Sequence, residues 1–74
     1  MERRVVMSRS EVGGRIKVSR IKAGMTQTEL ASKLGVTQGT VGAWEIGVSY
    51  PKPTNLVRLS EILKIPIDKL MKAV

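Results

Sequence analysis

Cysteine and histidine are both absent from this 74-residue sequence, and their absence excludes most of the chemistry that a small domain could carry. Without cysteine, neither a disulfide framework nor a zinc knuckle can hold the fold together. Without histidine, the chain lacks the commonest general base, the commonest metal ligand and the side chain that ordinarily titrates near neutral pH. Six acidic side chains and a few hydroxyl groups remain. We therefore predict that the chain is not an enzyme and holds neither a metal ion nor any other cofactor.

Long hydrophobic runs are absent as well. No apolar stretch approaches the ~20 residues that a membrane-spanning helix needs, and residues 1–7 lack the apolar centre of a signal peptide. A chain of 74 residues can bury one small core and has little room for a cleft. These absences predict a cytoplasmic protein of one domain, with no membrane partner and no evident small-molecule ligand.

Acidic residues are too few to balance the basic ones, which leaves a net charge of +7. The excess is concentrated before Gly24, where Glu2 and Glu11 oppose Arg3, Arg4, Arg9, Arg15, Lys17, Arg20 and Lys22. Such a surface is either merely well solvated or complementary to a polyanion, most often a nucleic acid. The one-sided distribution favours the nucleic acid.

Glycine and proline divide the chain into helix-sized segments. Residues 1–9 show no clear period and are predicted to form a basic arm, followed by a folded domain at residues 10–74. Ser10 is expected to cap a first helix that ends at Gly24. The inward face of this helix is predicted to carry Val12, Ile16 and Ala23.

Two short helices follow in quick succession. A capping box of Thr26 and Glu29 starts the second helix, and Gly35 ends it after about two turns. Thr37 caps a third helix, which Gly47 closes. The inward positions of the pair are Leu30, Ala31, Leu34, Val36, Val41 and Trp44. So tight a connection sets the two helices at a steep angle, as in a helix-turn-helix.

The remaining residues predict a loop and two more helices. Pro51 and Pro53 place residues 48–53 in a loop, after which a fourth helix begins at about Thr54. Its apolar face consists of Leu56, Leu59 and Leu63, with Ile62 beside them, and Ile67, Leu70 and Met71 outline a short fifth helix. The predicted fold class is therefore all-α, a compact bundle of five short helices.

The segment QTELASKLGVTQGTVGAWEIG resembles the helix-turn-helix of the lambdoid phage repressor and Cro class, the XRE-type regulators. The resemblance extends from about Arg15 to Met71 and includes the run from Trp44 to Pro51 and the closing IPIDKL. It implies a lambda-repressor-like domain that inserts its third helix in the major groove of double-stranded DNA. It also implies a homodimer on the two half-sites of a pseudo-palindromic operator.

The third helix carries the predicted base contacts. Gln38 is the main candidate, because its amide can pair with N6 and N7 of adenine. If Val41 faces the core, a rotation of about 100° per residue turns the neighbouring positions outward; these are Gly39, Thr40, Gly42 and Ala43. Relatives usually place amides or charged groups there. Either the bare face lets the backbone lie close to the bases, with Ala43 against a thymine methyl, or the helix merely tolerates its glycines.

Phosphate contacts are predicted around the motif. The resemblance implies that Gln27 donates to a phosphate, the alternative being an ordinary surface glutamine beside the cap. Thr37 is first a cap and also a phosphate candidate, and Lys52 in the following loop is another. The arginines of the arm form either a solvated tail or an arm that reaches phosphates or the minor groove; they are Arg3, Arg4 and Arg9.

The resemblance also implies a largely buried ion pair between Arg20 and Glu45, with a phosphate contact by Arg20 as the alternative. Three residues of the fifth helix are expected in the core, in a dimer contact or in both: Ile67, Leu70 and Met71. The whole pattern predicts a sequence-specific transcriptional regulator that occupies operator DNA. The alternative is an antitoxin-type module whose main partner is a toxin protein. RNA binding would suit the charge, but the chain has no aromatic platform for bases.

Overall fold

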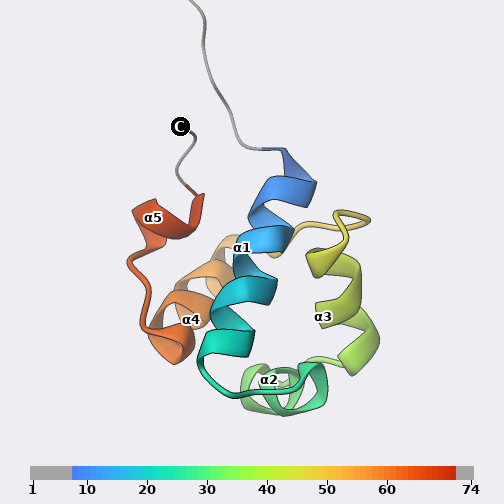
Figure 1. Ribbon diagram of the computed structural model, residues 1–74. Coiled ribbons are helices and arrows are strands. Elements are labelled where there is room, and N and C mark those ends of the chain that lie inside the picture. The colour runs from blue at the N-terminus through green and yellow to red at the C-terminus, as the bar shows by residue number, and fades with distance from the viewer. Residues whose placement is uncertain (1–7, 72–74) are drawn as a thin grey trace, which may run out of the picture.

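The computed structural model describes residues 8–71, which form five helices and no strand (Figure 1). The helices are α1 (Arg9–Lys22), α2 (Gln27–Leu34), α3 (Gln38–Glu45), α4 (Pro53–Leu63) and α5 (Ile67–Met71). In the view of Figure 1, α1 lies in the middle, α2 lies below its carboxyl end, and α3 stands on the side opposite α4 and α5. None of these five described helices is long and apolar enough to cross a membrane. The predicted all-α bundle of five short helices is confirmed.

The helix-turn-helix is delimited by the caps that the sequence predicted. Thr26 Oγ1 accepts a hydrogen bond from the backbone N–H of Glu29 (3.0 Å), and Glu29 Oε1 accepts one from the N–H of Thr26 (2.8 Å). Thr37 Oγ1 accepts in the same way from the N–H of Thr40 (3.1 Å). Gly35 ends α2 with a φ of +72°, a conformation that glycine adopts without steric penalty. These caps fix the short turn between α2 and α3.

The first helix begins earlier than predicted. Its N-cap is Ser8, whose Oγ accepts from the N–H of Glu11 (3.2 Å), while Glu11 Oε1 accepts from the N–H of Ser8 (2.7 Å). The prediction of Ser10 as the cap was wrong because only Ser8 has a glutamate three positions later to complete a capping box. Ser8 and Arg9 therefore belong to the start of α1, and residues 1–7 of the predicted arm lie outside the described residues. Ala23 is the exposed C-cap of α1 and does not face the core.

The buried core consists almost entirely of positions selected by the helical period. Its members are Val12, Ile16, Leu30, Ala31, Leu34, Val41, Trp44, Leu56, Leu59, Leu63 and Leu70. Val36 and Ile62 are half-buried against this cluster. Full burial of one such side chain contributes about 1.5–3 kcal/mol. Together they stabilise helices that would be too short to persist alone.

The backbones of α1 and α3 approach each other closely. A Cβ atom on Gly13 would lie 2.0 Å from the carbonyl oxygen of Trp44, and one on Gly47 would lie 2.9 Å from the Cα of Ser10. No side chain fits at either place. We call this contact the α1–α3 seam; it fixes the orientation of α3 on the rest of the domain.

Candidate nucleic-acid interface

A buried ion pair joins the two ends of the helix-turn-helix to α1. Arg20 Nε donates to Glu45 Oε2 at 2.6 Å, and a terminal nitrogen of the same guanidinium donates to Glu45 Oε1 at 3.1 Å. The other terminal nitrogen donates to the carbonyl oxygen of Met25 at 2.8 Å. The hydrogen bonds to Glu45 raise the pKa of Arg20 above its ordinary value, although burial opposes the shift. The structure thus brings the two residues of the predicted pair together, and the guanidinium faces the protein interior.

The same carboxylate holds Gln27, which the sequence did not predict. Gln27 Nε2 donates to Glu45 Oε1 at 2.9 Å, and Gln27 Oε1 accepts from Gln38 Nε2 at 2.6 Å. A continuous hydrogen-bonded chain therefore runs from Arg20 through Glu45 and Gln27 to Gln38. Gln27 is half-buried within it, while Gln38 is exposed at the first position of α3.

This chain has a fixed direction. A carboxylate paired with a guanidinium can only accept hydrogen bonds, so Gln27 must turn its NH₂ group toward Glu45. Its carbonyl oxygen then faces Gln38, which must in turn present an N–H. The Oε1 atom of Gln38 and its second N–H are left for a ligand. The buried ion pair thus determines the orientation of an exposed amide on α3.

Of the two glycines of α3, Gly42 lies beside the paired amides and Gly39 lies beside Thr37. A Cβ atom on Gly42 would lie 3.6 Å from Gln27 Oε1 and 3.7 Å from Gln38 Nε2, which is ordinary van der Waals contact. One on Gly39 would meet only Thr37 Oγ1, at 3.9 Å. Within the domain itself, neither position requires glycine.

The other predicted base contacts lie close to Gln38 in α3. Gly39 is exposed, whereas Thr40 and Ala43 are half-buried. The hydroxyl of Thr40 shares a hydrogen bond with Thr37 Oγ1 (2.8 Å), so Thr37 serves both as the cap of α3 and as a partner of Thr40. Of the five outward positions, Gln38 alone combines exposure with a long polar side chain.

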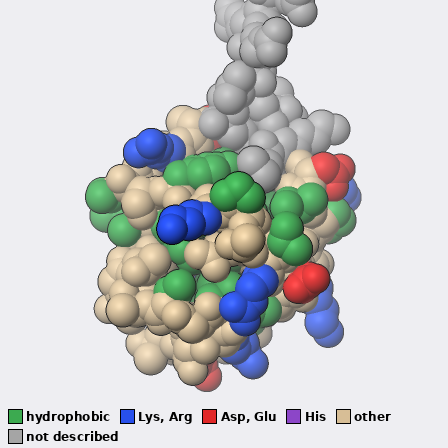
Figure 2. All heavy atoms as spheres, turned by 180° about the vertical axis from the view of Figure 1, so that it is seen from behind, with side chains coloured by type: hydrophobic (Ala, Val, Ile, Leu, Met, Phe, Trp, Pro, Cys, Tyr) green, Lys and Arg blue, Asp and Glu red, His purple; other side chains and the backbone are tan. Residues whose placement is uncertain are grey.

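The predicted phosphate ligands are more scattered. Lys52 is exposed at the N-cap of α4, and Arg9 is exposed at the start of α1. Arg3 and Arg4 lie outside the described residues. In the view from behind, lysine and arginine side chains are separated by hydrophobic and other groups and form no single basic stripe on that face (Figure 2). We define the candidate interface by the α2–α3 edge, where the hydrogen-bonded chain from Arg20 to Gln38 reaches the exposed surface.

The α5 residues differ in exposure. Leu70 is fully buried in the core, whereas Ile67 is exposed, and the side chain of Met71 is not among those described. Two exposed apolar residues directly after α3 were not predicted as surface residues from the sequence. Ile46 is 70% exposed and Val48 is 67% exposed. Their positions next to Gly47, in a loop, were the signal that could have identified them.

Sequence comparison agrees with this geometry. Residues 16–70 match the family model described as helix-turn-helix. The chain belongs to this helix-turn-helix family. It is 38% identical over 60 residues to the SPbeta prophage-derived uncharacterized HTH-type transcriptional regulator YonR of Bacillus subtilis (strain 168). The aligned segment covers 81% of this chain and 56% of YonR. The chain spans about half the length of the curated relatives it matches.

Solved structures that superimpose on this chain include complexes with DNA. The P22 c2 repressor in complex with a synthetic operator superimposes with a TM-score of 0.78 at 33% identity, over 82% of this chain and 92% of that one. SinR, the master regulator for biofilm formation, in complex with DNA gives 0.73 at 30% identity, over 80% and 95% of the two chains. The predicted resemblance to the phage repressor class is confirmed.

Proposed function

We propose that this chain is the DNA-binding domain of a cytoplasmic transcriptional regulator that places α3 in the major groove of an operator. The observation that carries the proposal is the oriented amide of Gln38, exposed at the start of α3 and held by Gln27. The P22 c2 and SinR complexes support it, because both similar structures contain DNA. The names of the curated relatives are those of transcriptional regulators, which favours this function over the antitoxin alternative.

In this mode of docking, Gln38 reads an adenine. Its Oε1 accepts from N6 of the base, and the N–H that is not bonded to Gln27 donates to N7. Guanine presents acceptors at both positions, so Oε1 of Gln38 would face O6 with no hydrogen between them. The direction of the hydrogen-bonded chain therefore favours adenine over guanine. Gly39, Thr40 and Ala43 complete the surface that faces the bases.

Phosphates are held at the borders of this surface. The second N–H of Gln27 and the free N–H groups at the start of α2 suit a phosphate oxygen. Thr37, Lys52 and Arg9 are further candidates, with Arg3 and Arg4 of the arm. Each phosphate neutralised by a cation steepens the logarithmic salt dependence of binding by about 0.9. Two copies of the domain, bound as a homodimer, would cover the half-sites of a pseudo-palindromic operator.

Random-site selection on the immobilised protein tests this function. We expect two symmetric half-sites, each with one strongly preferred adenine. Gln38→Ala should weaken the selected site by about 1–3 kcal/mol and relax that one position. Lys52→Ala is the matched control and should weaken all sequences alike. Failure to enrich any DNA sequence, or a Gln38→Ala protein with an unchanged preference, would contradict the proposal.

A further inference from the structure

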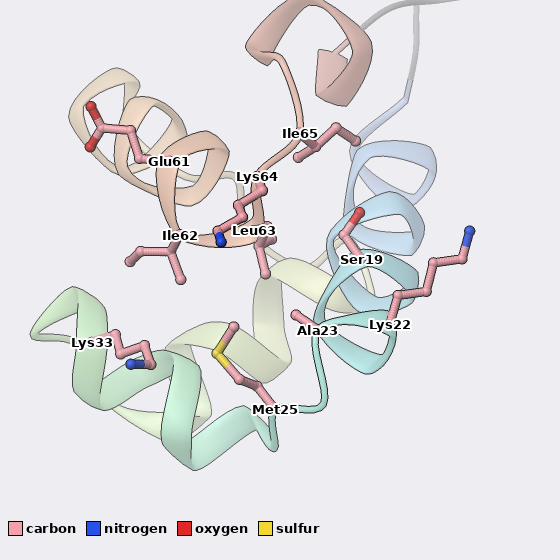
Figure 3. A pocket seen from close by; sticks show the side chains of 10 residues that line it. All are labelled: Ser19, Lys22, Ala23, Met25, Lys33, Glu61, Ile62, Leu63, Lys64 and Ile65. Atoms are coloured by element: carbon pink, nitrogen blue, oxygen red, sulfur yellow. The ribbon is translucent and has the colours of Figure 1, made fainter.

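A hollow of about 820 Å³ lies between the carboxyl end of α1, the helix α2 and the carboxyl end of α4 (Figure 3). Its middle is apolar and is lined by Ala23, Met25, Ile62, Leu63 and Ile65. Met25 and Leu63 point into it from opposite walls, with Ile62 beside them (Figure 3). None of the lining residues belongs to α3. The hollow is therefore separate from the α3 surface that is proposed to face the bases.

Two lysines at the rim give this hollow its charge. Lys33 on α2 and Lys64 at the end of α4 flank the apolar middle, whereas Lys22 and Glu61 point away from it (Figure 3). Within residues 8–71 the single salt bridge joins two residues elsewhere, so no described carboxylate lies within 4.0 Å of either rim ammonium group. The result is an apolar floor beneath two cations, of which Lys33 also acts electrostatically on Glu29 one turn earlier in α2.

The backbone of Lys64 is unusual in this chain. Lys64 is the C-cap of α4 with a φ of +56°, and the other described residues with positive φ are Gly24, Gly35 and Gly47. A side chain in this conformation crowds the following carbonyl, a strain that glycine avoids. At the end of α4 the chain thus retains a lysine where glycine would be more stable. Such a strained position suggests a use for the side chain.

We propose that this hollow is a binding site for a small organic carboxylate with an aliphatic body. Lys33 and Lys64 would hold the carboxylate, and Met25, Ile62 and Leu63 would cover the aliphatic part. Small-molecule sites are concave, mostly apolar and furnished with a few polar groups, in a volume of about 300–1,000 Å³. A protein partner would need about 800 Å² of surface on each side, which favours a small ligand for a feature of this size. The site does not depend on the DNA-binding proposal.

Octanoate is a suitable probe, because it carries one carboxylate on a short aliphatic chain. We would titrate it into isotopically labelled protein and follow the methyl and amide resonances by NMR. Saturable shifts are expected at Met25, Ile62 and Leu63, with resonances of Gln38 and Thr40 unmoved. Octylammonium and 1-octanol, which share the aliphatic chain, should bind about tenfold more weakly or not at all, because the first is repelled by the ammonium groups and the second offers them no negative charge.

Substitutions at the rim separate the site from the fold. Lys33→Gln combined with Lys64→Gln should weaken octanoate binding about tenfold or more, while Lys17→Gln, an exposed lysine of α1 that does not line the hollow, should leave it unchanged. Lys64→Gly should raise the melting temperature and still weaken octanoate. That combination cannot come from unfolding.

Three results would overturn the proposal. The first is equal binding of octanoate and 1-octanol, which would mean that the lysines contribute nothing. The second is an octanoate affinity that survives the double substitution. The third is a pattern of shifts that lies outside the residues lining the hollow. DNA binding by the parent protein could persist in all three cases, so the two proposals fail independently.

Discussion

The two helices of the helix-turn-helix have the same length of 8 residues and the same kind of N-cap, yet their internal stabilities differ. Helix α2 has a reciprocal capping box and ends on a left-handed glycine. Helix α3 has a threonine cap but no acidic residue in its first turn, and two of its eight residues are glycine. Interior glycine costs about 0.8–1 kcal/mol relative to alanine. By its local sequence, α2 is a good helix and α3 is a poor one.

What α3 lacks locally it receives from the rest of the domain. Val41 and Trp44 are buried in the core, Glu45 is paired with Arg20, and the α1–α3 seam holds its last turn. The comparison shows that the helix proposed to meet DNA is stabilised from behind by tertiary contacts. Its outward positions can therefore hold residues of low helix propensity, such as glycine, without loss of the helix.

Loss of the buried ion pair should have the largest effect. Glu45→Ala leaves the guanidinium of Arg20 buried without its carboxylate, and should lower the free energy of unfolding by about 3–5 kcal/mol. Urea denaturation measures the change. The matched substitution in α2 is Glu29→Ala, which removes an exposed capping glutamate and should have a much smaller effect. Equal losses from the two variants would remove the distinction between α2 and α3.

The α1–α3 seam offers a paired test on neighbouring glycines. Gly13→Ala brings a methyl group against the backbone of Trp44 and should destabilise the domain by about 1–3 kcal/mol or more. Gly14→Ala meets no atom within 4 Å and should stabilise α1 by up to about 1 kcal/mol. Thermal melting of the two variants gives the sign of each. A tolerated Gly13→Ala would show that α3 is not held by this contact.

Alanine at the two glycines of α3 should improve the helix. Because both positions have room for a methyl group, Gly39→Ala and Gly42→Ala should each stabilise the domain by up to about 1 kcal/mol. Binding of the selected operator then distinguishes the two interpretations of the bare face. Weaker binding by the more stable double variant indicates that the backbone lies close to the bases, whereas unchanged binding indicates that the glycines are only tolerated.

The smallest expected effect is the pH dependence of the stability that Glu29 contributes at the start of α2. The hydrogen bonds from the backbone and side chain of Thr26 lower the pKa of Glu29 below its ordinary value of 4.5. A lowered folded-state pKa means that Glu29 contributes stability above the ordinary value, and that this contribution is lost as the pH falls through the folded-state pKa. Melting temperatures of the parent and of Glu29→Gln should differ slightly at pH values above the ordinary pKa of glutamate. They should converge at pH values below the folded-state pKa of Glu29. A constant difference would contradict the assignment.

Local signals in the sequence predicted the fold well, because they are short-range. Apolar periodicity, the Thr26 capping box and the glycine at Gly35 each act within one or two turns, and each was found as expected. The error at the start of α1 was of the same local kind. Ser8 and Ser10 both suit a cap, and the choice depended on the glutamate at position 11.

The site was predictable only in part, because its geometry is long-range. Resemblance suggested Gln27 and the ion pair, and amide chemistry suggested Gln38. Nothing in the spacing showed that one carboxylate would join them in a single chain. The close approach at Gly13 and the rim position of Lys64 likewise depend on how distant segments pack. Such contacts are properties of the tertiary structure and have no signature within a single helix.

The seam also determines where an added segment would leave the domain. Because Gly47 lies against the backbone of Ser10, the first turn of α1 stands beside the end of α3. A fluorescent protein or affinity tag fused ahead of residue 8 would therefore emerge beside the carboxyl end of the helix that is proposed to enter the groove. A fusion joined after α5, which packs on the opposite side of α1 in Figure 1, would stand clear of it. Binding assays on this protein are best made with carboxyl-terminal labels.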